Sequence, residues 1–152
     1  MIHRLSLRQV LTLGSALLLA ACAPQKPAAE PVVEDAWARS TVEGQKMAAA
    51  YFTLRNEGET ELKLTGVSTN RAGSASLHRS AVDNGVATMR PLEGGLLIEP
   101  GETIAFEPGG DHVMLEMLEK PLVEGETFPM TLEFAAAAPI TLEVKIVGAG
   151  ER

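Results

Sequence analysis

The sequence is poor in aromatic residues, long apolar runs and basic residues, and each shortage argues against a class of protein. Only 4% of its 152 residues are aromatic, with Trp37 as the sole tryptophan, so base stacking has few platforms. Residues 10–21 are the longest apolar stretch, whereas a membrane-spanning helix needs about 20 apolar residues. The sequence has 13 basic and 20 acidic residues, which give a net charge of −7. Such a charge is a poor match for nucleic acid.

The single cysteine belongs to a segment that looks like a bacterial lipoprotein leader. A basic head with Arg4 and Arg8 precedes a short apolar run, and Leu19-Ala20-Ala21-Cys22 resembles a lipobox, where cleavage exposes a cysteine that carries lipid. Lipidation removes an exported thiol that would otherwise stay unpaired, and it supplies a membrane anchor. We therefore predict a signal peptide over residues 1–21 and lipidation of Cys22. The alternatives are an N-terminal helix of the folded domain and a stray cysteine in a discarded leader.

The leader also predicts where the protein resides and where its domain begins. Export places it in the periplasm or another extracytoplasmic space, and Ala23 after Cys22 favours the outer membrane in a Gram-negative host. Residues 22–33 contain three prolines and no hydrophobic period, as expected of a semi-extended tether. Residues 34–152 are predicted to form one domain, because 45% apolar content is enough for a core. Loss of residues 1–21 leaves 11 basic and 20 acidic residues, a net charge of −9.

Short apolar or alternating runs separated by turn residues fill the domain and predict an all-β fold. Turn sequences such as Asp83-Asn84-Gly85 and Pro108-Gly109-Gly110 supply the positive-φ or φ-locked residues that reversals require. No window shows a sustained helical period. Strands at this spacing predict an antiparallel Greek-key sandwich or barrel. The candidate strands are residues 36–40, 49–56, 62–68, 76–80, 86–92, 96–99, 103–107, 112–118, 128–134 and 140–147.

Two histidines and two methionines of this region form a soft, uncharged ligand set: His78, Met89, His112 and Met114. Imidazole and thioether ligands suit monovalent copper better than zinc, magnesium or calcium. Taken singly, such a methionine is more often core filler, and such a histidine is more often a surface or hydrogen-bonded residue. The set is what indicates a metal site. The remaining methionines of the domain are assigned to the core: Met47, Met117 and Met130.

Local geometry pairs these residues in two halves. A four-residue turn after His78 would place it directly opposite Met89, whereas a two-residue Asn-Gly turn would make the two diagonal neighbours; both bring the side chains within reach of one point. His112 and Met114 are two residues apart in one strand, so they project from the same face and Val113 from the other. We predict that the four ligands meet at one rim of the sandwich.

The ordered set resembles the PCu(A)C family of periplasmic copper chaperones. In this set, ten residues separate His78 from Met89. After a longer gap, Pro108-Gly109-Gly110 precedes His112-Val113-Met114. The similarity extends from Asp35-Ala36-Trp37-Ala38-Arg39 through Tyr51-Phe52-Thr53-Leu54-Arg55-Asn56 to Pro121-Leu122. The resemblance implies a cupredoxin-like β-sandwich that binds Cu(I) through His78, Met89, His112 and Met114. It also implies transfer of copper to the binuclear copper centre of cytochrome oxidase, alone or with a Sco-type thiol protein.

We therefore predict a membrane-anchored copper carrier, a binding protein and not an enzyme, with Cu(I) as cargo and Cu(II) left open. Ser80 departs from the family, whose members often have an additional methionine at this position. Blue-copper electron transfer would need a cysteine thiolate beside two histidines, and the only cysteine is Cys22. A metal-free sandwich that binds another protein of the cell envelope is the remaining alternative. No spacing singles out a hydrolytic acid/base pair or nucleophile.

Overall fold

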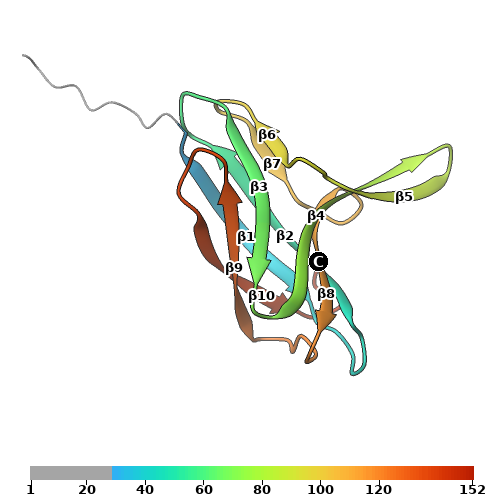
Figure 1. Cartoon of the computed structure of the whole chain (residues 1–152). Helices are drawn as coiled ribbons and strands as arrows, with labels where there is room; N and C mark the ends of the chain where they lie inside the picture. Colours follow the sequence, from blue (N-terminus) through green and yellow to red (C-terminus); the bar gives the residue numbers. More distant parts are fainter. Residues whose placement is uncertain (1–28) are drawn as a thin grey trace, which may run out of the picture.

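The computed structural model describes residues 29–152, and every regular element in that range is a β-strand (Figure 1). The all-β prediction is confirmed, and each of the predicted strands is present. Within residues 29–152, no helix is long and apolar enough to cross a membrane. The predicted signal peptide, Cys22 and most of the predicted tether lie outside the described residues. The strands are β1 (Pro31–Arg39), β2 (Met47–Asn56), β3 (Leu62–Thr69), β4 (Ala72–Asp83), β5 (Val86–Pro91), β6 (Leu96–Ile98), β7 (Thr103–Ala105), β8 (Asp111–Leu118), β9 (Thr127–Phe134) and β10 (Ile140–Val147).

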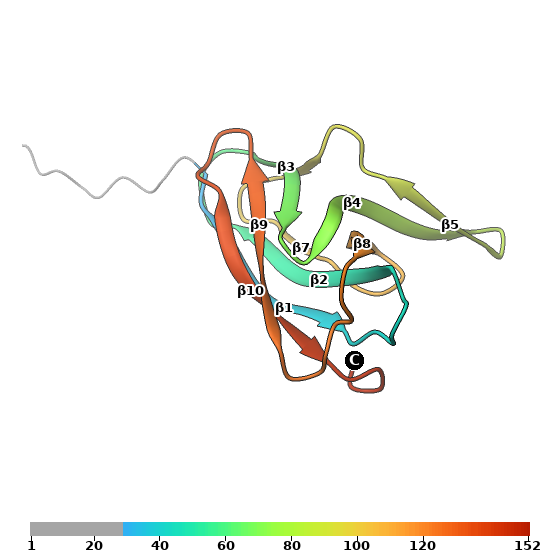
Figure 2. The ribbon, with the colours of Figure 1, turned by 60° about the horizontal axis from the view of Figure 1, so that its bottom comes forward.

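The strands form one sheet that folds over on itself into two layers (Figures 1 and 2). Its hydrogen-bonded order is β5-β4-β8-β2-β1-β10-β9-β3-β6, and β7 pairs with β2. β3 also lies beside β4, which brings the two halves of the sheet together. The named strand pairs are antiparallel except β1 and β10, which run parallel with Trp37 opposite Lys145. The predicted antiparallel sandwich thus contains one parallel pair, where the first and last strands meet across the long connection that parallel pairing needs.

β1 begins earlier than the sequence predicted, because the end of the predicted tether belongs to the sheet. Val33 pairs with Leu54 of β2. Pro31 occupies the first position of the strand, where proline is tolerated in a sheet. Asp35 lies in a bulge with a φ of 52°, and this bulge interrupts the alternation by which a strand is recognised. The first strand of the domain therefore starts at Pro31 rather than after residue 34.

The hydrophobic core lies between the two layers and consists mainly of aliphatic side chains. Phe52 of β2 stacks on Phe106 with ring centroids 4.2 Å apart. Met130 is fully buried, which confirms its assignment to the core. Met47 and Met117 are 50% and 60% exposed, so their assignment to the core is wrong. Each of these two exceptions has a physical reason in the backbone.

Met117 has a φ of 57°, and this left-handed residue breaks the alternation of β8. Leu118 therefore turns into the core in its place and is almost fully buried. Met47 is the first residue of β2, and it shares a face with Ala49 and not with the buried Ala50. Its side chain thus lies on the face of the sheet that points away from the core.

Candidate metal centre

β4 and β5 form the hairpin that carries His78 and Met89. Asn84 and Gly85 have φ values of 50° and 80° and make a two-residue turn, as this dipeptide favours. The turn places Met89 opposite Ser80. His78 and Met89 are therefore diagonal neighbours on one face, the second of the two arrangements that the sequence allowed. Ser80, the departure from the family, faces Met89 directly.

The pairing of β4 with β8 brings the two halves together. His112 lies directly opposite His78, and Met114 lies opposite Ser76. The two imidazole rings are tilted by 41°, with centroids 5.9 Å apart. Val113 is fully buried in the core, on the opposite side of β8, as the alternation predicted. One face of the sheet thus presents both histidines and Met114.

A hollow of about 270 Å³ opens on this face. It contains three of the four predicted ligands, Met89, His112 and Met114, while His78 lies beside it, opposite His112. Met89 is 51% exposed, whereas His112 is only 4% exposed. The hollow therefore connects a buried imidazole with a thioether in contact with solvent. The remaining lining residues are Met47, Ala48, Ala49, Tyr51, Ser80 and Gly109.

The turn before β8 orients the imidazole of His112. The Gly110 carbonyl oxygen accepts a hydrogen bond from His112 Nδ1 at 3.0 Å. A carbonyl can only accept, so Nδ1 carries the hydrogen and Nε2 has a free lone pair in the neutral ring. The same carbonyl accepts the backbone N–H of Ser80 at 3.0 Å, which ties the turn to β4. Histidine ligands of metals usually donate the N–H of the non-ligating ring nitrogen in this way, as His112 Nδ1 does to the Gly110 carbonyl oxygen.

Each of the two histidines has one buried ring nitrogen without a hydrogen-bond partner. His78 Nε2 lies 3.1 Å from the Ser76 hydroxyl oxygen, and its Nδ1 has no partner. His112 Nε2 has none either. Among the described residues, Arg71 Nε is the other buried side-chain nitrogen or oxygen in this condition. Buried polar atoms are normally paired because an unpaired one costs about 1–3 kcal/mol, so two such atoms at one site need an explanation.

An ion pair on the opposite face fixes the register of β4 against β8. Arg79 donates to both carboxylate oxygens of Asp111, at 2.6 and 2.8 Å. The hydrogen bond to this carboxylate raises the pKa of Arg79. A slip of one residue would break the pair and turn His78 to the wrong face. The ion pair thus helps to hold His78 opposite His112 from the other face of the sheet.

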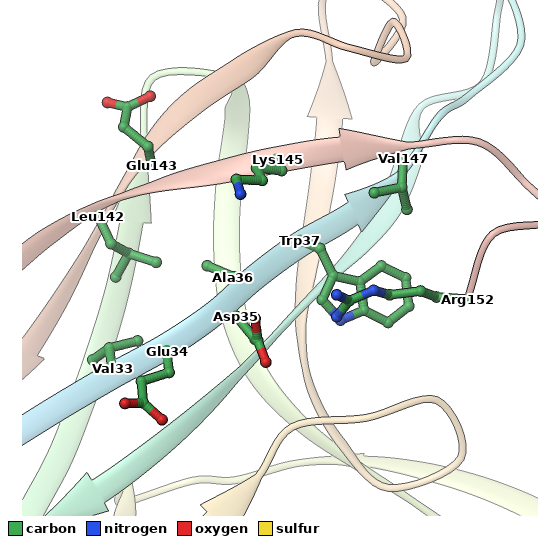
Figure 3. Close-up of a pocket in the computed structure, with 10 residues that line it drawn as sticks. All are labelled: Val33, Glu34, Asp35, Ala36, Trp37, Leu142, Glu143, Lys145, Val147 and Arg152. Atoms are coloured by element: carbon green, nitrogen blue, oxygen red, sulfur yellow. The ribbon is translucent and has the colours of Figure 1, made fainter.

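Tyr51 lines the hollow and contacts Trp37, which lines a second concave region (Figure 3). Its ring packs on Trp37 with centroids 4.5 Å apart, and burial raises the pKa of its hydroxyl, against the opposing effect of Arg39. The second region, of about 240 Å³, lies along the β1–β10 seam. In Figure 3, Arg152 crosses the face of Trp37, 5.7 Å from the ring centroid. Among residues 29–152, those that line this region include no histidine, cysteine or methionine.

The sequence did not identify Met47 and Tyr51 as residues of the hollow. Their spacing shows that they share a face of β2, but only the pairing of Ala49 with Met114 reveals that this face adjoins the site. Such a pairing between distant strands leaves no local signal. Among residues 29–152, no three His, Cys, Asp or Glu side chains are grouped to hold a metal ion.

Comparisons with known proteins agree with this architecture. The family described as "LpqE-like: Putative lipoprotein LpqE-like" matches residues 32–146. A relative from Leifsonia xyli subsp. xyli, "Putative lipoprotein Lxx21020", is 34% identical over 136 residues, which are 87% of this chain and 81% of the relative.

Two solved structures are similar over most of the chain. The apo PCuAC domain from PmoF1 is 30% identical with a TM-score of 0.67, over 82% of this chain and 97% of that domain. The solution structure of Cu(I)-DR1885 from Deinococcus radiodurans is 28% identical with a TM-score of 0.61, over 87% of this chain and 84% of that chain. These matches confirm the resemblance to the PCu(A)C family and its cupredoxin-like fold, and the chain belongs to the LpqE-like family.

Proposed function

We propose that this protein is a lipid-anchored, extracytoplasmic chaperone that binds Cu(I) through His78, Met89, His112 and Met114. The observation that carries the proposal is His112 Nε2, a buried nitrogen without a partner in a hollow lined by the thioethers of both predicted methionine ligands, Met89 and Met114. A soft monovalent ion satisfies that lone pair and suits the sulfur atoms around it. The second orphaned nitrogen, on His78 directly opposite, supports the same assignment.

The ligand set favours Cu(I) as the cargo. All four donors are neutral, so the site holds a single positive charge without a carboxylate or a thiolate. Thioether sulfur is a soft donor that stabilises Cu(I), whereas Cu(II) prefers tetragonal nitrogen and oxygen ligands. The similar DR1885 structure is described as a Cu(I) form, which agrees with this preference. A rigid β-frame keeps the donors close before the ion arrives.

The position of the site supports the proposed delivery of copper, and Cys22 supports the proposed anchoring. The half-exposed Met89 gives an incoming ligand access to the ion, so a thiolate or imidazole of an acceptor can displace the thioethers one at a time. The resemblance points to the copper centre of cytochrome oxidase or a Sco-type protein as acceptor. The lipoprotein name of the Leifsonia relative supports a lipid on Cys22.

Replacement Cys22→Ser is expected to move the protein from the membrane fraction to the soluble fraction.

A Cu(I) competition titration against a chromogenic chelator tests the proposed site. The parent protein is expected to bind one Cu(I), and His78→Ala or Met114→Leu should weaken binding by about tenfold or more. Met117→Leu is the matched control, because Met117 is exposed but does not line the hollow. The proposal fails if the parent takes no Cu(I) from the chelator. It also fails if both ligand variants bind as tightly as the control.

A further inference from the structure

We propose that Met47 is an additional copper-contacting residue, an exchange ligand that takes Cu(I) from Met114 during loading and release. This inference rests on the proposed function and assigns a step in it to a residue outside the predicted ligand set. The hollow then has a thioether at each of its two ends and the buried ligands between them. Strand register, exposure and backbone anchoring each support this assignment.

The register places Met47 next to Met114 on the ligand face. Met47 lies opposite Glu116 of β8, and Ala49 lies opposite Met114. Paired residues share a face, and so do residues two apart in a strand. Met47 and Met114 are therefore diagonal neighbours, a relation in which long side chains can touch. Both line the same hollow.

The order of the ligands along the strands puts Met47 at the end opposite Met89. On β4, Ser80 faces Met89, His78 faces His112, and Ser76 faces Met114. Met47 comes one step further, beyond Met114. From one end of the hollow to the other, the side chains are thus the exposed thioether of Met89, the buried imidazole of His112, the buried thioether of Met114 and the exposed thioether of Met47. Three of the five methionines that follow Met1 line this one hollow.

The exposure of Met47 fits an exchange ligand better than a packing residue. Its side chain is 50% exposed, so it contributes little to the core, in contrast to the fully buried Met130. The neighbouring Ala49 is small and leaves the space between Met47 and Met114 open. An unbranched thioether with three rotatable bonds can sample that space and also reach solvent.

The backbone at Met47 is fixed although its side chain is exposed. Gln45 Nε2 donates to the Met47 carbonyl oxygen at 2.7 Å. Lys46 is bound to Leu118 of β8 through its ammonium group, and its carbonyl oxygen accepts the Leu118 N–H, each at 3.1 Å. The start of β2 is therefore held against β8, and motion of Met47 is confined to its side chain. Such an arrangement keeps the sulfur within reach of the site.

The proposed step is a ligand substitution without change of oxidation state. The Met47 sulfur donates a lone pair to Cu(I), and the Cu–S bond to Met114 breaks. The ion keeps its single positive charge, and no proton moves. An external ligand then displaces the Met47 sulfur and removes the ion. Because the same intermediate serves both directions, loss of Met47 should slow loading and release alike and leave the equilibrium affinity nearly unchanged.

Stopped-flow transfer of Cu(I) to a chromogenic chelator tests this step in the whole, copper-loaded protein. Met47→Leu keeps the apolar volume of the side chain and removes the sulfur. We expect transfer to slow by about tenfold while the titrated affinity stays within about threefold of the parent. Met117→Leu is the control, since it removes an exposed thioether outside the hollow; its transfer rate should equal that of the parent.

A contact readout complements the rates. With methyl-labelled methionine, Cu(I) loading should shift or broaden the Met47 methyl resonance and leave that of Met117 unchanged. The inference is overturned if Met47→Leu transfers copper as fast as the Met117→Leu control, or if the Met47 resonance does not respond. A tenfold loss of affinity in Met47→Leu would also overturn it, because Met47 would then be a resident ligand. A parent that binds no Cu(I) refutes the proposed function itself, which separates the two failures.

Discussion

Two buried polar side chains of this domain, Asn56 and His112, have opposite hydrogen-bonding states. Asn56 is the last residue of β2 and is fully buried. Its carbonyl oxygen accepts the N–H groups of Gly58 and Glu30, at 3.0 and 3.4 Å, and its amide group donates to two backbone carbonyl oxygens, at 2.8 and 3.1 Å. His112 is 4% exposed, yet its Nε2 has no partner.

We propose that this difference separates a structural role for Asn56 from a binding role for His112. The polar atoms of Asn56 are satisfied within the protein, so nothing further can bind them without breaking the fold. The orphaned lone pair of His112 carries a desolvation cost that the apo protein leaves uncompensated. A residue of the first kind should affect stability and not copper binding, and a residue of the second kind should do the reverse. The following experiments test this contrast.

Asn56→Ala is expected to have the largest effect, a loss of about 3 kcal/mol in the free energy of unfolding, because several buried backbone groups lose their partner together. Denaturant unfolding followed by circular dichroism measures it. The Cu(I) affinity of the folded variant should equal that of the parent. A copper-binding defect in folded Asn56→Ala would remove the contrast between the two residues.

His112→Leu should weaken Cu(I) binding by about a hundredfold, or about 2.8 kcal/mol, because the best-placed nitrogen is lost. The same change should leave the unfolding free energy of the apo protein unchanged, or raise it by up to about 1 kcal/mol, since an unpaired buried nitrogen is removed. Chelator titration and denaturant unfolding give the two values. A large loss of apo stability would show that His112 has a structural role like that of Asn56.

Arg79→Ala should destabilise the protein by about 1 kcal/mol, because the arginine is half exposed and its ion pair is partly screened. The buried carboxylate of Asp111 loses its partner, and the alignment of His78 with His112 is less firmly held. Unfolding experiments at low and high salt measure the loss, with Arg79→Lys as the variant that keeps the charge but not the two-point contact. Equal stability of parent and Arg79→Ala would argue against this role.

The smallest expected effect is a change of Trp37 fluorescence on copper loading. Tyr51 touches both the hollow and Trp37, so rearrangement around a bound ion should alter the emission of the only tryptophan. Folded Asn56→Ala should keep this response, and His112→Leu should lose it. A response that persists in His112→Leu would indicate copper bound elsewhere.

The fold was largely predictable from sequence because its signals are local. Asn84-Gly85 specifies a tight turn, and alternation in β8 places Val113 on the face opposite the predicted ligands. Prediction failed where single residues leave regular geometry. The bulge at Asp35 hid the first half of β1, and the left-handed Met117 exchanged places with Leu118. Positive φ at a residue such as Met117, outside a turn sequence, has no reliable sequence signal.

The arrangement of the candidate ligands was predictable within each half of the proposed site but not between the halves. Spacing placed His78 near Met89, and His112 beside Met114. That His78 lies directly opposite His112 depends on the pairing of β4 with β8, strands that are not consecutive in the chain. The position of Met47 beside the hollow was not predicted for the same reason, because its neighbour Met114 lies on another strand.

The pairing of Pro31 with Asn56 sets the direction in which the site faces. The predicted tether joins the domain at the end of β2, and Met47 lies at its start, about 30 Å away at the usual rise of 3.3 Å per residue. With Cys22 anchored as proposed, the Met47 end of the hollow would lie at the opposite end of β2 from the attachment point. If the protein delivers copper as proposed, exchange with an acceptor in the same membrane would be a search in two dimensions at a high effective concentration. Affinity for the acceptor itself can remain weak.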